Sequence, residues 1–183
     1  MWKWPFLLLA CLDVHAAAYA VDGYKDLRFG MTQKEIRGLC PVPLAEVPGA
    51  GPGSGFTTML YTEEFPFNGS SHLATFGFNG DSFKMFQVHL KAAEFDAVFR
   101  GLKEKYGEPD FGPDFNEELF RKAVDRILAA SLKPGAMVVG TFDWKSIKLI
   151  ARQDGVTGNP QLILTYVAKV VSGDGSAVNS NDL

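Results

Sequence analysis

The chain has 183 residues, a formal net charge of −3 at pH 7 and a hydrophobic fraction of 46%, which is ordinary for a globular protein. Its mildly acidic balance argues against a nucleic-acid partner, because phosphate binding requires a basic stripe of Lys and Arg. Beyond residues 1–20, no apolar run approaches the length of a membrane-spanning helix.

Residues 1–20 predict a signal peptide. Lys3 places a positive charge ahead of an apolar run, 6–12. The segment ends in Ala18-Tyr19-Ala20, the small-x-small pattern that a signal peptidase cleaves. We therefore expect cleavage after Ala20 and a mature protein that is periplasmic or secreted, in an oxidising setting.

A second interpretation of the same segment is a lipid anchor. Leu8-Leu9-Ala10-Cys11 resembles a bacterial lipobox, in which the cysteine becomes the lipidated first residue. Residues 6–9 alone would then form the apolar core, which is short for membrane insertion. The soluble form is favoured for this reason, and an anchor at Cys11 stays as the alternative.

Removal of the leader leaves Cys40 as the single cysteine of the mature chain. No disulfide can then form within the chain, so packing must supply its stability. A free cysteine is most often a small buried hydrophobe, which is the simpler interpretation. A bond from Cys40 to another chain remains the alternative.

The first predicted elements are a short extended segment, 24–29, and a short helix. Thr32 is a favourable N-cap, and Glu35 stands three residues later, which completes a capping box. Pro41 ends this helix, because proline cannot continue it. Residues 45–55, rich in Gly and Pro, predict a linker.

A β region follows, with strands predicted over 56–61, 72–78 and 81–90 and a loop over 63–71. Asn79-Gly80 is a strong hairpin signal, because both central residues of such a turn need a positive φ. A two-residue loop there pairs residue 78 with 81 and residue 74 with 85.

This register places His72 and His89 on the same sheet face as diagonal neighbours. Two imidazoles could contribute to a transition-metal site or act as a pH sensor. A metal site needs three or four ligands and only two are found here. We therefore expect no metal, with His72 and His89 as weak candidates and partly exposed strand-end residues as the simpler interpretation.

The remaining chain predicts two helices and three strands. Apolar residues at helical spacing mark 92–106, and Asp114 with Glu117 begins a second helix that ends before Pro134. Strands are predicted over 137–144, 147–152 and 161–171, and 172–183 predicts a flexible polar tail.

This element order predicts an α+β fold of antiparallel sheet meanders. Two runs of about three strands would pack against three helices. We expect one domain over 21–171, either as a single unit or as two helix-on-sheet halves, 21–90 and 91–171.

The opening of the mature chain resembles a known family. Tyr24-Lys-Asp-Leu-Arg-Phe-Gly-Met-Thr-Gln-Lys-Glu-Ile-Arg-Gly-Leu is similar to the start of small bacterial envelope domains, among them the assembly lipoprotein BamE and the secreted β-lactamase inhibitory protein. Thr75-Phe76-Gly77-Phe78 is similar to a strand segment of that inhibitor. The resemblance implies a protein–protein binding module of the cell envelope without chemistry of its own. It assigns no functional residue, and the cysteine pairs of the inhibitor are absent here.

The best binding candidate is the predicted loop 61–68, which carries Tyr61, Phe65 and Phe67. Aromatic side chains on a loop lose little entropy on binding and bury a large area against a partner. The alternative is that Phe65 and Phe67 close the open end of the core.

No Ser-His-Asp order, HExxH motif or Gly-x-Ser-x-Gly elbow is present, and no nucleotide or metal signature is found. We therefore expect a non-enzyme without a cofactor. The leading hypothesis is an exported, non-catalytic module that binds another envelope or secreted protein. The alternatives are a carrier of a small apolar ligand or lipid held between sheet and helices, and an unrecognised extracytoplasmic enzyme.

Overall fold

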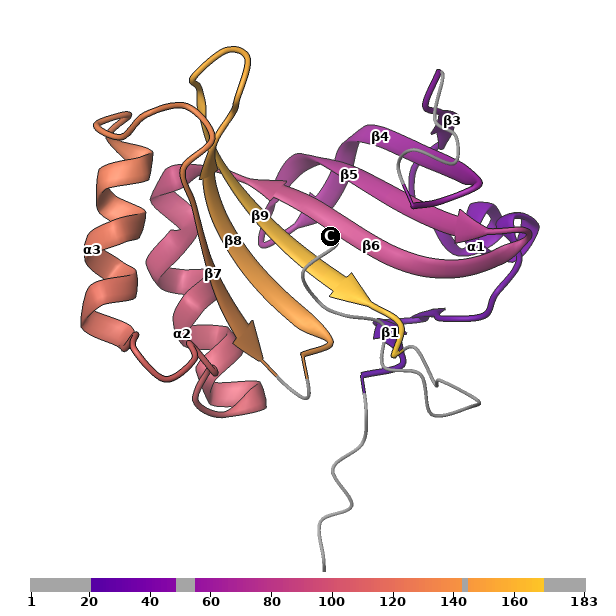
Figure 1. Cartoon of the computed structure of the whole chain (residues 1–183). Helices are drawn as coiled ribbons and strands as arrows, with labels where there is room; N and C mark the ends of the chain where they lie inside the picture. Colours follow the sequence, from indigo (N-terminus) through magenta and orange to yellow (C-terminus); the bar gives the residue numbers. More distant parts are fainter. Residues whose placement is uncertain (1–20, 49–54, 143–144, 170–183) are drawn as a thin grey trace, which may run out of the picture.

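The computed structural model describes residues 21–48, 55–142 and 145–169. The predicted signal peptide with Cys11 and Ala20, and the predicted tail 172–183, lie outside these residues. The described chain forms a two-stranded sheet, a seven-stranded antiparallel sheet in the order β3-β4-β5-β6-β9-β8-β7, and helices on one side of it (Figure 1). The strands are β1 Gly23–Tyr24, β2 Leu27–Arg28, β3 Ala45–Glu46, β4 Thr58–Phe67, β5 Ser70–Asn79, β6 Ser82–Leu90, β7 Met137–Phe142, β8 Ile147–Gln153 and β9 Pro160–Val167.

The helices are α1 Gln33–Leu39, α2 Phe95–Tyr106, α3 Glu117–Leu128 and a single 3-10 turn, Ala92–Glu94, which leads into α2. Thr32 and Glu35 form the predicted capping box of α1, and the Thr32 backbone N–H donates to Glu35 Oε2 at 2.8 Å. For α3 the predicted cap was wrong. Asn116 caps this helix by accepting from the Leu119 N–H at 3.0 Å. Within the described ranges, no helix combines the length and the apolar character needed to cross a membrane.

The predicted arrangement of two meanders packed on three helices, or of two helix-on-sheet halves, is wrong. The early strands β3–β6 and the late strands β7–β9 join in one sheet, because β9 pairs with β6 rather than ending a separate meander. The pairs Phe86↔Tyr166 and Leu90↔Leu162 fix this junction. The molecule is therefore mostly sheet, and helix and strand segments share one core.

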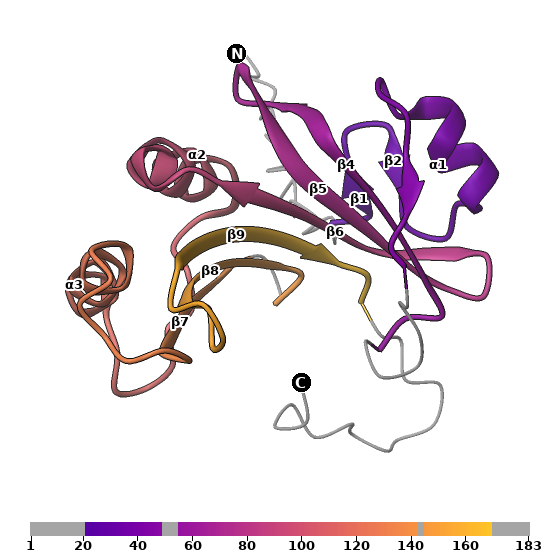
Figure 2. The same ribbon diagram turned by 90° about the horizontal axis from the view of Figure 1, so that it is seen from above.

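One face of this sheet carries the core across both runs of strands. A single row of paired positions crosses six strands, and every residue in it is buried. Its members are Leu60, Phe76, Phe86, Tyr166, Ile147 and Phe142. The helices α1, α2 and α3 lie on this side of the curved sheet (Figure 2). Ile36 of α1, Phe99 of α2 and Phe120 of α3 are fully buried against it.

The β5–β6 hairpin has a different register from the predicted one. Asn79 pairs with Ser82, so the two turn residues are 80 and 81, and an irregularity beside Gly77 then pairs this glycine with Met85. A bulge adds one residue to one strand, so the side chains beyond it point to the opposite faces of the sheet from those in a regular ladder. Met85, expected on the core face, lies on the opposite face for this reason.

The predicted loop 63–71 is also wrong, because β4 continues to Phe67 and β5 already begins at Ser70. Asn68 and Gly69 form the turn between them with φ of 47° and 79°. Asn-Gly is the preferred pair for such a turn, because both residues tolerate a positive φ. The chain thus has two Asn-Gly pairs. The pair at 68–69 forms the centre of its turn, whereas the pair at 79–80, from which the hairpin was predicted, lies one residue away from the centre.

Candidate binding groove

The β1–β2 hairpin lies across the core face and divides it into two hollows. Its central side chain is Tyr24, whose ring stacks on Phe86 of β6 with 4.9 Å between centroids and lies 5.5 Å from Tyr166 of β9. Aromatic pairs at these separations hold each other in fixed orientations. The stacking of Tyr24 thus anchors the hairpin over the middle of the sheet.

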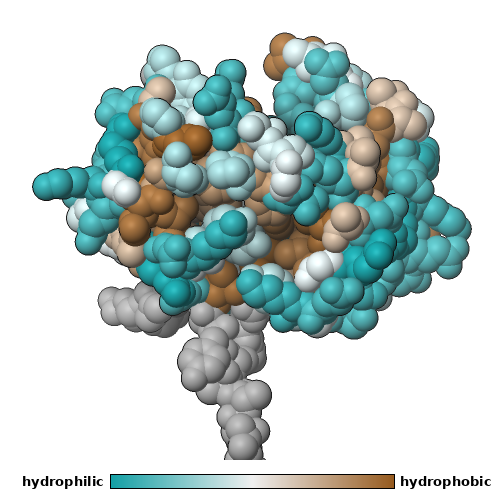
Figure 3. Space-filling view, turned by 180° about the vertical axis from the view of Figure 1, so that it is seen from behind, coloured by the Kyte–Doolittle hydropathy of each residue, from teal (hydrophilic) through white to brown (hydrophobic). Residues whose placement is uncertain are grey.

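The larger hollow is a groove of about 420 Å³ between this hairpin and α2, which we call the tyrosine groove. Seen from the helix-bearing side, apolar side chains are visible along a hollowed strip between polar ones (Figure 3). The β9 strand gives its floor, α2 one wall, and the hairpin with the tip of β4–β5 the rest. The lining residues are Gly23, Tyr24, Lys25, Phe67, Asn68, Ala97, Val98, Gly101, Leu102, Lys105, Tyr106, Leu164 and Tyr166.

Three phenol groups meet in the tyrosine groove, from β1, the end of α2 and β9. Burial raises the pKa of Tyr166, and Tyr106 and Tyr24 beside it raise it further. Burial, and then Tyr106, also raise the pKa of Tyr24. These two hydroxyls therefore stay protonated at neutral pH and can act as hydrogen-bond donors.

Two lysines stand at the rim of the tyrosine groove. The ammonium group of Lys25 lies 5.3 Å from the centre of the Tyr24 ring, and that of Lys105 lies 4.9 Å from the centre of the Tyr106 ring. Within the described part of the chain, neither lysine forms an ion pair with a carboxylate. The lining residues also include no Asp or Glu, so the groove carries positive charge without an internal counter-ion.

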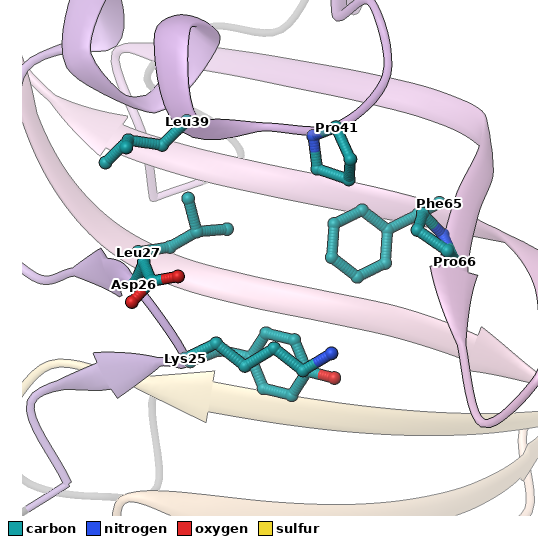
Figure 4. Close-up of a pocket in the computed structure, with 8 residues that line it drawn as sticks. Lys25, Asp26, Leu27, Leu39, Pro41, Phe65 and Pro66 are labelled. Atoms are coloured by element: carbon teal, nitrogen blue, oxygen red, sulfur yellow. The ribbon is translucent and has the colours of Figure 1, made fainter.

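The smaller hollow lies on the other side of the hairpin, between it, the end of α1 and β4, and has about 220 Å³. Figure 4 shows Leu39 and Pro41 above this hollow, Leu27 on its left, Phe65 on its right and Lys25 along its lower side, so Lys25 lines both hollows. Asp26 stands at the edge of the smaller hollow. This hollow therefore differs from the tyrosine groove in size and in its acidic group.

The three residues predicted as a binding loop are separated by the fold. Phe65 is 3% exposed and packs in the core against Phe76 and Phe86, with ring centroids 5.9 and 5.1 Å apart. Phe67 is half-buried at the end of the tyrosine groove. Tyr61 is half-buried on the opposite face of the sheet, paired with Thr75. The alternative that Phe65 closes the core agrees with its burial.

The two candidate histidines do not form a pair. His72 pairs with the core residue Phe65, and its side chain is on the core face, where it is 4% exposed. The His89 side chain is on the other face, because its neighbours in β6, Val88 and Leu90, face the core. The contact between the two histidines runs from His72 Nδ1 to the backbone oxygen of His89, at 3.0 Å. Among the described residues, no cluster of three or more His, Cys, Asp or Glu could hold a metal ion.

Cys40 follows the last residue of α1 and is half-buried against the edge of the core. Burial raises the pKa of its thiol, with a smaller opposing effect from a hydrogen bond to the Val42 backbone. A thiol with a raised pKa is a weak nucleophile at neutral pH. The environment of Cys40 thus resembles that of a packing residue.

Sequence reasoning missed the tyrosine groove. Its three tyrosines stand at core positions of their elements, where Phe or Leu would serve packing alone. A tyrosine at such a position needs a partner or solvent for its hydroxyl, so several of them indicate a core edge that is open. The signal was therefore present at Tyr24, Tyr106 and Tyr166, but their convergence required the fold.

A protein-family model described as "Uncharacterised protein" matches residues 24–173, which include both runs of strands and, apart from Gly23, the β1–β2 hairpin and the lining of the tyrosine groove. No curated protein and no solved structure matches the chain.

Proposed function

The chain belongs to this family of uncharacterised proteins, and we propose that it is an exported binding protein that carries a small apolar ligand in the tyrosine groove. The observation behind the proposal is the groove itself, which opens between sheet and helix beside a closed core. Its volume of about 420 Å³ falls in the usual range for small-molecule sites, roughly 300–1,000 Å³.

The chemistry of the lining supports binding rather than bond breaking. Its apolar lining includes Val98, Leu102, Leu164 and aromatic rings, and its polar side chains carry hydroxyls, one amide and two ammonium groups. The lining residues include no His, Cys, Ser, Asp or Glu, and the lysines and tyrosines that they do include have no base or acid partner among the other lining residues. We therefore propose a carrier without catalytic function.

We also propose that this carrier is exported from the cytoplasm. It depends on the signal peptide predicted for residues 1–20, outside the described residues, and on the envelope-domain resemblance of the opening segment. Mass spectrometry of the mature N-terminus from a fractionated cell tests it. A periplasmic or secreted chain that begins at Val21 is expected, and an intact cytosolic chain would contradict export.

A protein partner is the second candidate, and a specific observation favours it. Leu39 is 49% exposed at the rim of the smaller hollow, next to Pro41 and above Phe65. An exposed leucine beside a concave apolar surface can receive a side chain from another envelope protein. A pull-down with wild type and Leu39→Asp separates the two candidates, because this change leaves the tyrosine groove intact.

The carrier proposal is tested by filling the groove. Gly101 lines it from α2, and a Cβ atom added at this position meets nothing within 4 Å, so we expect the ring of Gly101→Phe to occupy the groove. Gly38 on α1 is equally open and lies outside the groove, which makes Gly38→Phe the matched control. We expect calorimetric binding of decanol or decanoate to wild type and to Gly38→Phe, and its loss in Gly101→Phe. Binding of neither compound, or binding that Gly101→Phe leaves unchanged, would contradict the proposal.

A further inference from the structure

We propose that the tyrosine groove selects an anionic amphiphile, a small molecule with an apolar body and one carboxylate; this inference rests on the carrier function proposed above. The apolar floor determines where the body lies. The charge of the rim determines the head group. The floor and the α2 wall would bind the apolar body, and the two rim lysines would bind the carboxylate.

The apolar body is assigned to the floor and to the α2 wall. Leu164 is 1% exposed and Tyr166 5% exposed, so a ligand there would contact side chains already held rigidly by the sheet. Val98 and Leu102 on successive turns of α2 face the same space. A rigid, preformed apolar surface binds a chain or a ring with little ordering cost.

The head group is assigned to the rim, where Lys25 and Lys105 stand on opposite walls. Lys25 follows β1 at the tip of the hairpin, and Lys105 lies in the last turn of α2. Both ammonium groups lie over tyrosine rings and are without a carboxylate partner among the described residues. A ligand carboxylate between them would gain charge-assisted hydrogen bonds that no residue of the lining supplies.

Two basic residues close to the groove wall, Lys103 of α2 and Arg121 of α3, differ from these two lysines. Lys103, two residues before Lys105 in α2, is bound to Glu117 at 2.6 Å and to Glu108 at 2.9 Å. Arg121 is bound to Asp96 and Glu117. The charges of Lys103 and Arg121 are therefore already compensated by carboxylates, whereas Lys25 and Lys105 keep theirs for a ligand.

The tyrosine hydroxyls complete the preference for an anion. Tyr24 and Tyr166 have raised pKa values because they are buried, so each keeps its proton and can donate to an oxygen anion. A ligand ammonium group would instead meet two like charges on the rim. The same groove that attracts a carboxylate therefore disfavours a cation of equal length.

The test compares three ligands that differ only in the head group: decanoate, decanol and decylammonium. With wild-type protein at neutral pH we expect decanoate to bind about tenfold more tightly than decanol, and decylammonium more weakly than decanol. In the double variant Lys25→Gln and Lys105→Gln, this preference should fall to about twofold. Lys122→Gln, which changes an exposed lysine of α3 outside the groove, should leave it unchanged.

The outcomes separate this inference from the carrier proposal. Equal binding of the three ligands, or tighter binding of decylammonium, would overturn the selection of an anion and leave the carrier standing. A preference for decanoate that survives in the double variant would overturn the role of the two lysines. Binding of none of the three ligands would overturn the carrier proposal and, with it, this inference.

Discussion

His72 of β5 and Glu94 of the turn before α2 meet inside the protein. The His72 Nε2 atom lies 3.3 Å from Glu94 Oε1, and the side chains are 1% and 13% exposed. The second oxygen of Glu94 accepts from the Lys91 backbone N–H at 2.7 Å. This carboxylate thus connects the start of β5 to the start of α2, the helix that forms one wall of the tyrosine groove.

Removal of this connection should destabilise the protein. Glu94→Ala leaves the His72 ring without its carboxylate neighbour and the Lys91 N–H without its acceptor. We expect the free energy of unfolding to fall by about 0.5–1.5 kcal/mol, the usual net contribution of one hydrogen bond, here the one that Glu94 accepts from the Lys91 N–H. Urea unfolding measures it, and Glu104→Ala on the exposed side of α2 is the control. Equal losses in both variants would show that the contact contributes nothing.

Phe65 and Phe67 are buried to different degrees, so we expect truncation of each ring to alanine to have a different effect. Phe65 contacts two core rings and is 3% exposed, so Phe65→Ala should cost about 3–5 kcal/mol of stability. Phe67→Ala removes a half-buried ring at the end of the tyrosine groove, so its cost should be smaller and ligand binding should weaken. Thermal melting and calorimetry on both variants check this, with Tyr61→Ala as a variant on the opposite face. Similar melting losses for Phe65→Ala and Phe67→Ala would contradict the assignment.

Local signals predicted the helices and most strands. The Thr32–Glu35 capping box involves only neighbouring residues, and Gly107 at the end of α2 has the φ of 82° that favours glycine. Apolar periodicity likewise placed Phe99 and Tyr166 on inward faces. Such features depend on a few consecutive residues, so they can be predicted before the fold is known.

Pairing between distant strands could not be predicted in this way. The junction of β6 with β9 joins residues about 80 positions apart, as in Phe86↔Tyr166, and no short segment encodes it. The faces of His72 and His89 were wrong for a related reason. One bulge beside Gly77 changes the parity of the ladder, and nothing in the alternation pattern shows where a bulge occurs.

The bulge itself gives a prediction. A Cβ atom on Gly77 would lie 2.9 Å from the ring of Phe56, closer than packed side chains allow. Gly77→Ala should therefore destabilise the protein by about 1–3 kcal/mol through overpacking. Gly38→Ala, in an open position of α1, should instead stabilise it by about 0.5–1 kcal/mol. Denaturant midpoints for the two variants should move in opposite directions, and a common direction would be evidence against the packing of Phe56 on β5.

His89 predicts how stability depends on pH. Its side chain is half-buried on the face of the sheet opposite the core, with Arg152 on the same face. Burial, and then the charge of Arg152, lower the pKa of His89 below its ordinary value of 6.5. The unfolded chain therefore takes up a proton at this residue before the folded chain does as the pH falls.

The linkage has a definite sign. The stability associated with neutral His89 is fully present above about pH 6.5 and is lost as the pH falls through the lower folded pKa. Wild type should therefore lose more stability between about pH 7 and pH 5 than His89→Gln, which carries no titrating group there. Arg152→Gln should lose an intermediate amount of stability over this pH range, because it removes the charge that lowers the pKa of His89 but keeps the imidazole buried. Urea midpoints at several pH values measure these differences, and parallel pH profiles for wild type and His89→Gln would show that the ring is solvated in the folded state.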